Sequence, residues 1–202
     1  MTPMSAVAAA GAAAMVLVTA AALPGAVHAA DASDVTHYVL DPAKSSLEFV
    51  FLQAGAKNKG RFKHFAVSFD FSPANPGASR LDVTVDMNSV DTGDDERDTT
   101  LRGGDLFAVT KSPQAHFSAS QINKTQAGYE AVGKLTIRDV TRDMRVPFTF
   151  RTATENGAAA GYMSGKTSLR RPDYGVGQGD WKATDQVGDE VEVSFALRLT
   201  AH

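Results

Sequence analysis

The sequence contains no cysteine. This excludes disulfide bonds, a thiol nucleophile, and metal or haem sites that depend on cysteine ligands. It also excludes attachment to a membrane through a lipid-modified N-terminal cysteine. The domain must therefore be held together by its hydrophobic core, and no membrane anchor is expected once a signal peptide has been removed.

A strong excess of either charge is absent as well. Twenty Lys and Arg stand against 23 Asp and Glu, which gives a formal net charge of −3. Proteins that bind nucleic acid usually carry a basic face, and this balance indicates no nucleic-acid partner. It argues in the same way against an anionic membrane as the main partner.

Charged side chains are missing altogether from residues 1–30, which are rich in Ala, Val and Leu. Pro24 and Gly25 interrupt the apolar run, and the sequence Val27-His28-Ala29 then offers small residues where a signal peptidase cleaves. A retained transmembrane helix would need about 20 uninterrupted apolar residues. We therefore expect a signal peptide over residues 1–29 and a single domain over residues 30–202.

The remaining sequence alternates apolar and polar residues, which is typical of half-buried β-strands. The clearest segment is Glu190 to Thr200, where Val191, Val193, Phe195 and Leu197 share one face. Further strands are predicted at Leu47–Phe51, Phe65–Phe71, Leu81–Met87 and Met144–Arg151, and weaker ones at His37–Leu40, Gln114–Gln121, Gly128–Ile137 and Gly161–Leu169. Pro147 within one of them suits an edge or a bulge. Eight or nine such strands predict an all-β antiparallel barrel or sandwich.

A single short helix is predicted between the strands. Thr92 and Asp95 have the spacing of a capping box, acidic residues continue to Glu96, and Gly103-Gly104 ends the segment. Arg97 lies on this helix beside Asp98, and it either forms a structural ion pair there or contacts a ligand.

No motif of an enzyme or a metal site is present in this sequence. His37, His64 and His116 are scattered without ligand spacing, and helix capping explains Asp94, Asp95 and Glu96 better than metal binding does. No serine stands in a nucleophile-elbow context, and no glycine-rich phosphate loop occurs. We expect no catalytic residue, no metal and no cofactor.

Several segments, in order from Tyr38 to Leu199, resemble the YceI family of polyisoprenoid-binding proteins. They are Asp41–Phe49, Gly60–Phe62 with Phe65 and Phe69-Asp70, Ser89–Gly93 with Arg97-Asp98 and Leu101-Arg102, Asp105–Phe107, Gly133–Arg138 with Val140-Thr141, and Arg171–Gly175. Two positions depart from the family pattern: Asp139 replaces a hairpin glycine, and Leu106 replaces an aromatic residue.

The resemblance implies a single antiparallel lipocalin-like β-barrel of about eight strands, with the short helix near its mouth. It also implies a soluble periplasmic or secreted protein that holds an isoprenoid quinone, a polyprenyl phosphate or a similar lipid. In a closed barrel one face of each strand looks inward. The residues expected in the lumen are Leu47, Phe49, Phe51, Leu81, Val83, Val85, Leu101, Phe107, Met144, Val146 and Phe148, and those expected at the head group are Arg97 and Arg171.

Two other functions remain open at this point. A barrel of eight strands can be filled by its own side chains, in which case the protein serves in interactions, for example with a membrane redox partner, or in a stress response. The other is an enzyme acting on such a lipid. The oligomeric state and the identity of the lipid are not determined by the sequence.

Export gives a first prediction. N-terminal sequencing of the protein recovered outside the cytoplasm of its host should begin at Ala30 or within a residue or two of it. Soluble protein that still begins with Met1 would contradict the expected cleavage.

Overall fold

The computed structural model describes residues 35–155, 157–183 and 185–202. The expected signal peptide therefore lies outside the described residues. Most of the chain that is described is β-strand, and all strand pairings in it are antiparallel.

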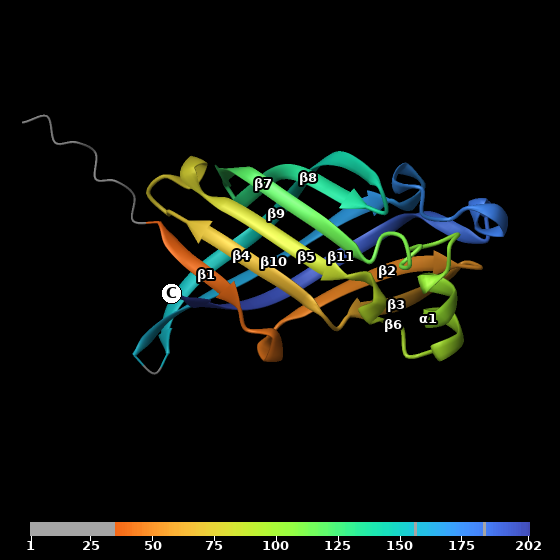
Figure 1. The fold of residues 1–202 in the computed structure, drawn as a ribbon. Helices are drawn as coiled ribbons and strands as arrows, with labels where there is room; N and C mark the ends of the chain where they lie inside the picture. Colours follow the sequence, from red (N-terminus) through yellow and green to blue (C-terminus); the bar gives the residue numbers. More distant parts are fainter. Residues whose placement is uncertain (1–34, 156, 184) are drawn as a thin grey trace, which may run out of the picture. The chain divides into compact units, whose positions relative to one another are not determined.

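Eight strands form a closed ring (Figure 1). In ring order they are β1 (Thr36–Leu40), β4 (Phe65–Phe71), β5 (Arg80–Asp86), β7 (Gln114–Thr125), β8 (Gly128–Ile137), β9 (Val140–Glu155), β10 (Ala158–Arg170) and β11 (Val187–Ala201). The ring closes where β1 pairs with β11, from Tyr38 opposite Ala201 to Leu40 opposite Leu199. The predicted barrel of about eight strands is confirmed.

The hairpin of β2 (Ser46–Gln53) and β3 (Ala56–Phe62) extends one side of the barrel beyond this ring. β2 pairs with the first part of β11, and β3 reaches the short strand β6 (Val90–Asp91). The sequence did not predict β3 from alternation, because its segment Ala56-Lys57-Asn58-Lys59-Gly60-Arg61-Phe62 has only Ala56 and Phe62 as apolar side chains. Its strand conformation comes from pairing with the strongly apolar β2.

The two ends of the barrel carry different elements. Figure 1 shows helix α1 (Asp95–Arg102) and the β2–β3 hairpin at one end, and the C-terminus at the other. The remaining short elements are 3-10 helices: η1 (Pro42–Lys44), η2 (Pro76–Ala78), η3 (Met87–Ser89), η4 (Arg171–Tyr174) and η5 (Gly179–Lys182).

The predicted helix is confirmed, but its N-cap is Asp94, whose carboxylate accepts a hydrogen bond from the Arg97 N–H at 3.0 Å. Thr92 instead donates to buried Asp98 through both its backbone N–H and its hydroxyl.

The turn between β8 and β9, and the proline within β9, each have a backbone arrangement that their residues allow. The two-residue turn between Ile137 and Val140 places Arg138, and not Asp139, at a positive φ of 53°. Asp139 accepts a hydrogen bond from Ser112 at 3.1 Å instead. Pro147 is paired with Glu130 of β8 but lies just beyond the last β9–β10 pair, Phe148 opposite Gly165, so on the β10 side its missing N–H interrupts no pairing.

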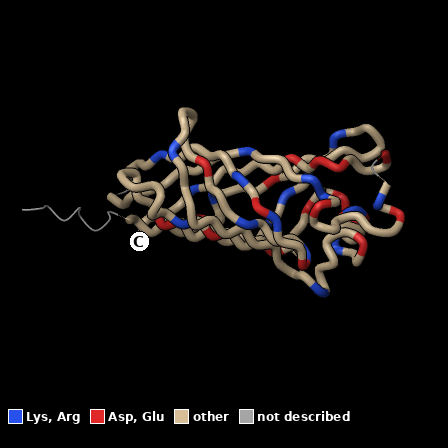
Figure 2. Tube along the Cα trace, turned by 90° about the horizontal axis from the view of Figure 1, so that it is seen from above, with Lys and Arg blue, Asp and Glu red and all other residues tan. Residues whose placement is uncertain are grey.

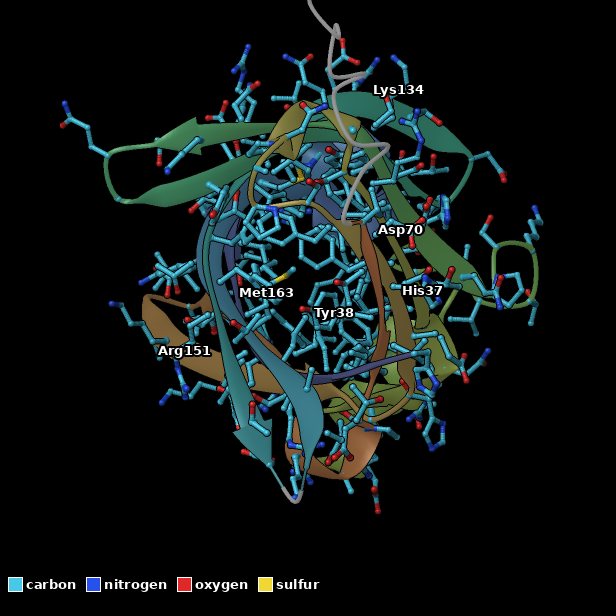
Figure 3. All side chains as sticks on the ribbon, turned by 90° about the vertical axis from the view of Figure 1, so that its left-hand side faces the viewer. His37, Tyr38, Asp70, Lys134, Arg151 and Met163 are labelled. Atoms are coloured by element: carbon cyan, nitrogen blue, oxygen red, sulfur yellow. The ribbon has the colours of Figure 1, made fainter. Side chains whose placement is uncertain are left out.

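An aromatic cluster fills the barrel at the end away from α1. Its rings come from neighbouring strands and pack at centroid distances such as 4.9 Å between Phe71 and Phe150 and 5.9 Å between Phe69 and Phe148; its members are Tyr38, Phe69, Phe71, Tyr129, Phe148 and Phe150. We call this cluster the floor. Figure 3 looks into this end and shows Tyr38 and Met163 inside the ring, with Arg151 and Lys134 outside it.

Close packing of the floor requires the absence of a side chain at one position. A Cβ on Gly161 would lie 2.7 Å from the Phe150 ring and 3.2 Å from Tyr38. Because buried rings at such density leave no room for a methyl group, any larger residue at 161 would displace the aromatic side chains.

The floor gives a second prediction. Phe148→Ala removes a ring that contacts Phe69 and Tyr129 in a fully packed region, so the free energy of unfolding should fall by about 3–5 kcal/mol. Phe148→Leu, which keeps most of the volume, is the control and should cost clearly less. Urea unfolding measures both, and a loss below about 1 kcal/mol for Phe148→Ala would show that the floor is not tightly packed.

Candidate functional site: an apolar cavity beneath a hydrogen-bonded cap

Between the floor and helix α1 the barrel encloses a cavity of about 240 Å³. Inward-facing apolar residues of nearly every strand border it, from Leu47 on β2 to Leu197 on β11. The polar side chains among the described residues that border it are Gln53, Arg97, Thr100, His116, Thr167 and Arg171. Such a surface binds an apolar molecule through the removal of its surface from water.

The strand residues expected in the lumen surround this cavity, with a single exception. The bordering residues include Leu47, Phe49, Phe51, Leu81, Val83, Val85, Met144 and Val146, together with Leu101 and Phe107 from the end near α1. Phe148 shares the inward face of β9 with Met144 and Val146, but it belongs to the floor and does not border the cavity. Alternation along a strand shows which side chains point into the barrel. Whether an inward side chain packs in the floor or borders the cavity depends on its depth along the barrel.

Phe49 lies where the β2–β3 hairpin covers the cavity. Its ring packs against Phe62 at 5.2 Å and Phe51 at 6.0 Å. Gly60 on the paired strand makes this possible, because a Cβ there would lie 2.3 Å from the Phe49 ring. The glycine thus allows the aromatic side chain to lie flat against the hairpin, next to the empty volume.

Two chain segments meet across the end of the cavity and form what we call the cap, residues 103–113 and 171–183. Its apolar contact is made by buried Leu106, Tyr174 and Val176. The carbonyl oxygen of Asp105 accepts hydrogen bonds from the N–H groups of Gly177 at 2.9 Å and Gln178 at 2.8 Å. The cap is therefore joined by backbone hydrogen bonds as well as by packing.

Arg171 organises the second cap segment from the inside. Its guanidinium is buried and donates to the carbonyl oxygens of Val176, Trp181, Ala183, Val187 and Gly188 at 2.7–3.5 Å. Burial lowers the pKa of Arg171 from its ordinary value, and nearby Asp189 opposes that effect. Since backbone carbonyls already engage the guanidinium nitrogens, Arg171 does not fit the head-group role expected from the sequence. Its side chain shapes the loop that borders the cavity.

Arg97 has a different environment. It borders the cavity, and 30% of its side chain is exposed. The guanidinium lies 3.7 Å from the Asp94 carboxylate, whereas the neighbouring Asp98 is engaged by Thr92. Arg97 thus forms the ion pair on its helix that the sequence left open, but with Asp94 and not with buried Asp98, and it also borders the cavity.

Helix α1 holds Arg97 in this place through Arg102. The Arg102 guanidinium donates to the carbonyl oxygens of Asn88 in η3 and Val90 in β6, both at 2.9 Å, and so ties the helix to these two elements. Leu101 packs with the cap and with the cluster around Phe49. A cation with one long ionic contact is thereby positioned where the apolar cavity reaches the surface.

The described residues contain no group of three or more His, Asp and Glu placed to hold a metal ion. None of the helices in the same part of the chain is both long and apolar enough to cross a membrane. Charges of both signs are mixed along the barrel (Figure 2).

Known proteins resemble this chain in sequence and in fold. A UPF0312 protein of Yersinia pestis is 38% identical over 106 residues, which make up 52% of this chain and 55% of that protein. The chain therefore matches only about half the length of curated relatives such as this one. The crystal structure of Burkholderia cenocepacia BcnA is 34% identical, covers 79% of this chain and 98% of its own, and superposes with a TM-score of 0.72.

A third comparison concerns the fold alone. A polyisoprenoid binding domain from Saccharophagus degradans, implicated in plant cell wall breakdown, has a TM-score of 0.60 at 19% identity and covers 82% of this chain and 98% of its own. The YceI-like domain model matches residues 38–199, which is nearly the whole described barrel. The closed antiparallel barrel, its apolar cavity and this match together place the chain in the YceI family.

Proposed function

We propose that this protein binds the apolar chain of an isoprenoid-type lipid in the barrel cavity, and that it carries the lipid in the periplasm after export. The single observation that carries the proposal is the apolar cavity between the floor and the cap. Membership of the YceI family and the polyisoprenoid-binding domain of similar fold support it. We propose binding rather than catalysis, because the bordering surface is apolar and offers contact area for a hydrocarbon chain.

Burial of hydrocarbon provides sufficient energy for such binding. Each methylene removed from water contributes about 0.8 kcal/mol, so a five-carbon isoprene unit contributes roughly 3–4 kcal/mol. The loss of translational and conformational freedom on binding offsets part of this. Two or three buried units therefore contribute roughly 6–12 kcal/mol before that cost, which makes the hydrocarbon chain the main source of binding energy.

The size of the cavity limits how much of the chain is enclosed. An engineered protein cavity of about 150 Å³ binds benzene, with six carbons. On that scale the present cavity of about 240 Å³ holds about ten carbons, or two isoprene units. A longer lipid must leave its remaining units outside the cavity or displace side chains of the cap, because the aromatic floor blocks the other end.

Arg97 is the residue we propose for the head group. It is cationic, partly exposed and at the border of the cavity. A phosphate or a quinone carbonyl held there would accept its hydrogen bonds while the isoprenoid chain extends inward. A phosphate would gain more, because both partners of the hydrogen bond are then charged.

The lipid itself provides the direct test. Organic-solvent extraction of protein purified from its host, followed by mass spectrometry, should recover a prenyl lipid in stoichiometric amount. Phe49→Ala enlarges the cavity next to the ring it removes, so the amount or the chain length of the recovered lipid should change.

Each other outcome of the extraction contradicts the proposal in a defined way. Recovery of a chemically altered lipid after incubation would favour an enzyme. Recovery of no lipid from the wild type, together with a loss of about 3–5 kcal/mol in Phe49→Ala, would favour a barrel that serves only in protein interactions.

The head-group assignment predicts a selective effect of Arg97→Gln. Loss of one charged hydrogen bond should weaken binding of a short prenyl phosphate by at least about tenfold. Binding of the matching uncharged prenol should change little, and titration calorimetry can measure both. Lys124→Gln, an exposed change at the β7–β8 end, is the control. Equal weakening of phosphate and prenol would assign Arg97 a structural role.

A further inference from the structure

We propose that the outer face of the β2–β3 hairpin docks on a lipid bilayer that carries anionic head groups. We call this surface the hairpin face, and it consists of Val50, Leu52, Lys57 and Lys59. Its location follows from the structure alone, and its purpose rests on the proposed lipid-binding function.

Strand register places these four side chains together. Phe49 and Phe51 face the cavity, and their partners across the hairpin, Gly60 and Asn58, share that inner face. The alternate pairs therefore lie on the outer face, with Leu52 opposite Lys57, Val50 opposite Lys59 and, further from the turn, Glu48 opposite Arg61. Leu52 is 43% exposed, which is the largest exposed fraction among the large apolar residues described.

The lysines of the hairpin face carry uncompensated charge. Neither Lys57 nor Lys59 forms an ion pair with a described residue, although both are exposed. The next two cations differ: Arg61 and Lys63 both contact Asp91, at 2.8 and 3.2 Å, and hold the pKa of that carboxyl at about 2. The positive charge available to a partner is therefore concentrated towards the tip of the hairpin.

The hairpin is also placed where a lipid would have to pass. Its inner face and α1 both border the cavity, and Figure 1 shows them at the same end of the barrel. Along Ala56–Gly60, β3 has no second strand partner within the described part of the chain. Contact of the hairpin face with a bilayer would thus bring the cavity entrance, with Arg97, close to the head-group layer.

Lysines on a free strand edge also have a simpler explanation, because charge there discourages edge-to-edge aggregation. That explanation does not account for Leu52, because its exposed apolar side chain, opposite Lys57, would favour aggregation. An amphipathic surface of Leu and Lys instead matches the interface of a bilayer, where apolar and cationic groups both find partners.

Other charges limit the strength of the contact. Asp94, Asp95 and Glu96 begin α1, and the protein as a whole has a net charge of −3. Glu48, on the same outer face as the two lysines, also weakens the attraction to an anionic surface. Binding should therefore be weak, reversible and sensitive to salt, as transfer of a lipid requires.

Vesicle sedimentation tests the proposal. The purified protein should associate with vesicles of equal parts phosphatidylglycerol and phosphatidylcholine at low ionic strength, and much less with pure phosphatidylcholine. Lys57→Gln with Lys59→Gln should lower the partition coefficient on the order of 30-fold, since each cation near an anionic surface contributes about 1 kcal/mol. Leu52→Asn should lower it further without changing the charge.

A matched pair of substitutions controls for net charge. Lys44→Gln with Lys124→Gln changes the total charge equally at exposed positions outside the hairpin, and it should leave vesicle binding within about twofold of the wild type. Circular dichroism verifies that each variant is folded. No association of the wild type with anionic vesicles, or an equal loss in both lysine pairs, would overturn the proposal.

Vesicle sedimentation and lipid extraction on the same wild-type and variant proteins distinguish this proposal from the carrier function. A lipid recovered by extraction from a protein that does not associate with vesicles would overturn docking and leave the carrier function standing. Selective loss of vesicle binding in the hairpin variants, with no lipid ever recovered, would support docking and contradict the carrier function.

Discussion

Backbone hydrogen bonds between β1 and β11 close the sheet, and the environment of every inward-facing side chain follows from that closure. An open sheet would leave one apolar face to be covered by another layer. Closure removes that face from water without a second sheet or a layer of helices. It also leaves a central volume whose contents depend on the side chains at each depth.

This volume has two regions. Aromatic rings from β1, β4, β8 and β9 fill the floor, where Phe69 is completely buried. Nearer α1 the residues around the cavity are mostly Leu, Val and Met, together with Phe side chains such as Phe49, Phe51 and Phe107. Eight strands are close to the size at which side chains can still fill the interior. How closely the inward side chains meet at each depth therefore separates the packed floor from the cavity.

The two arginines that border the cavity differ in the partners of their guanidinium groups. Arg171 is surrounded by backbone carbonyls, so its role is to hold a loop that has little regular structure of its own. Arg97 has one ionic contact at 3.7 Å and remains partly exposed. A buried cation must have its hydrogen bonds satisfied by the protein, whereas a cation at the surface can exchange water for a ligand.

The sequence by itself determined the class of the fold, because period-two alternation in segments such as Glu190–Thr200 admits few structures other than antiparallel strands. It also located the short helix, although with Thr92 rather than Asp94 as its cap. All but one of the lumen residues that it named border the cavity, since alternation reveals which side chains share a face. It could not reveal β3, whose residues become a strand by pairing with β2. The depth of Phe148 in the floor, the carbonyl partners of Arg171 and the position of Lys57 opposite Leu52 were decided only by the tertiary structure. Each depends on strand register or on contacts between residues distant in the chain, and local sequence pattern carries neither.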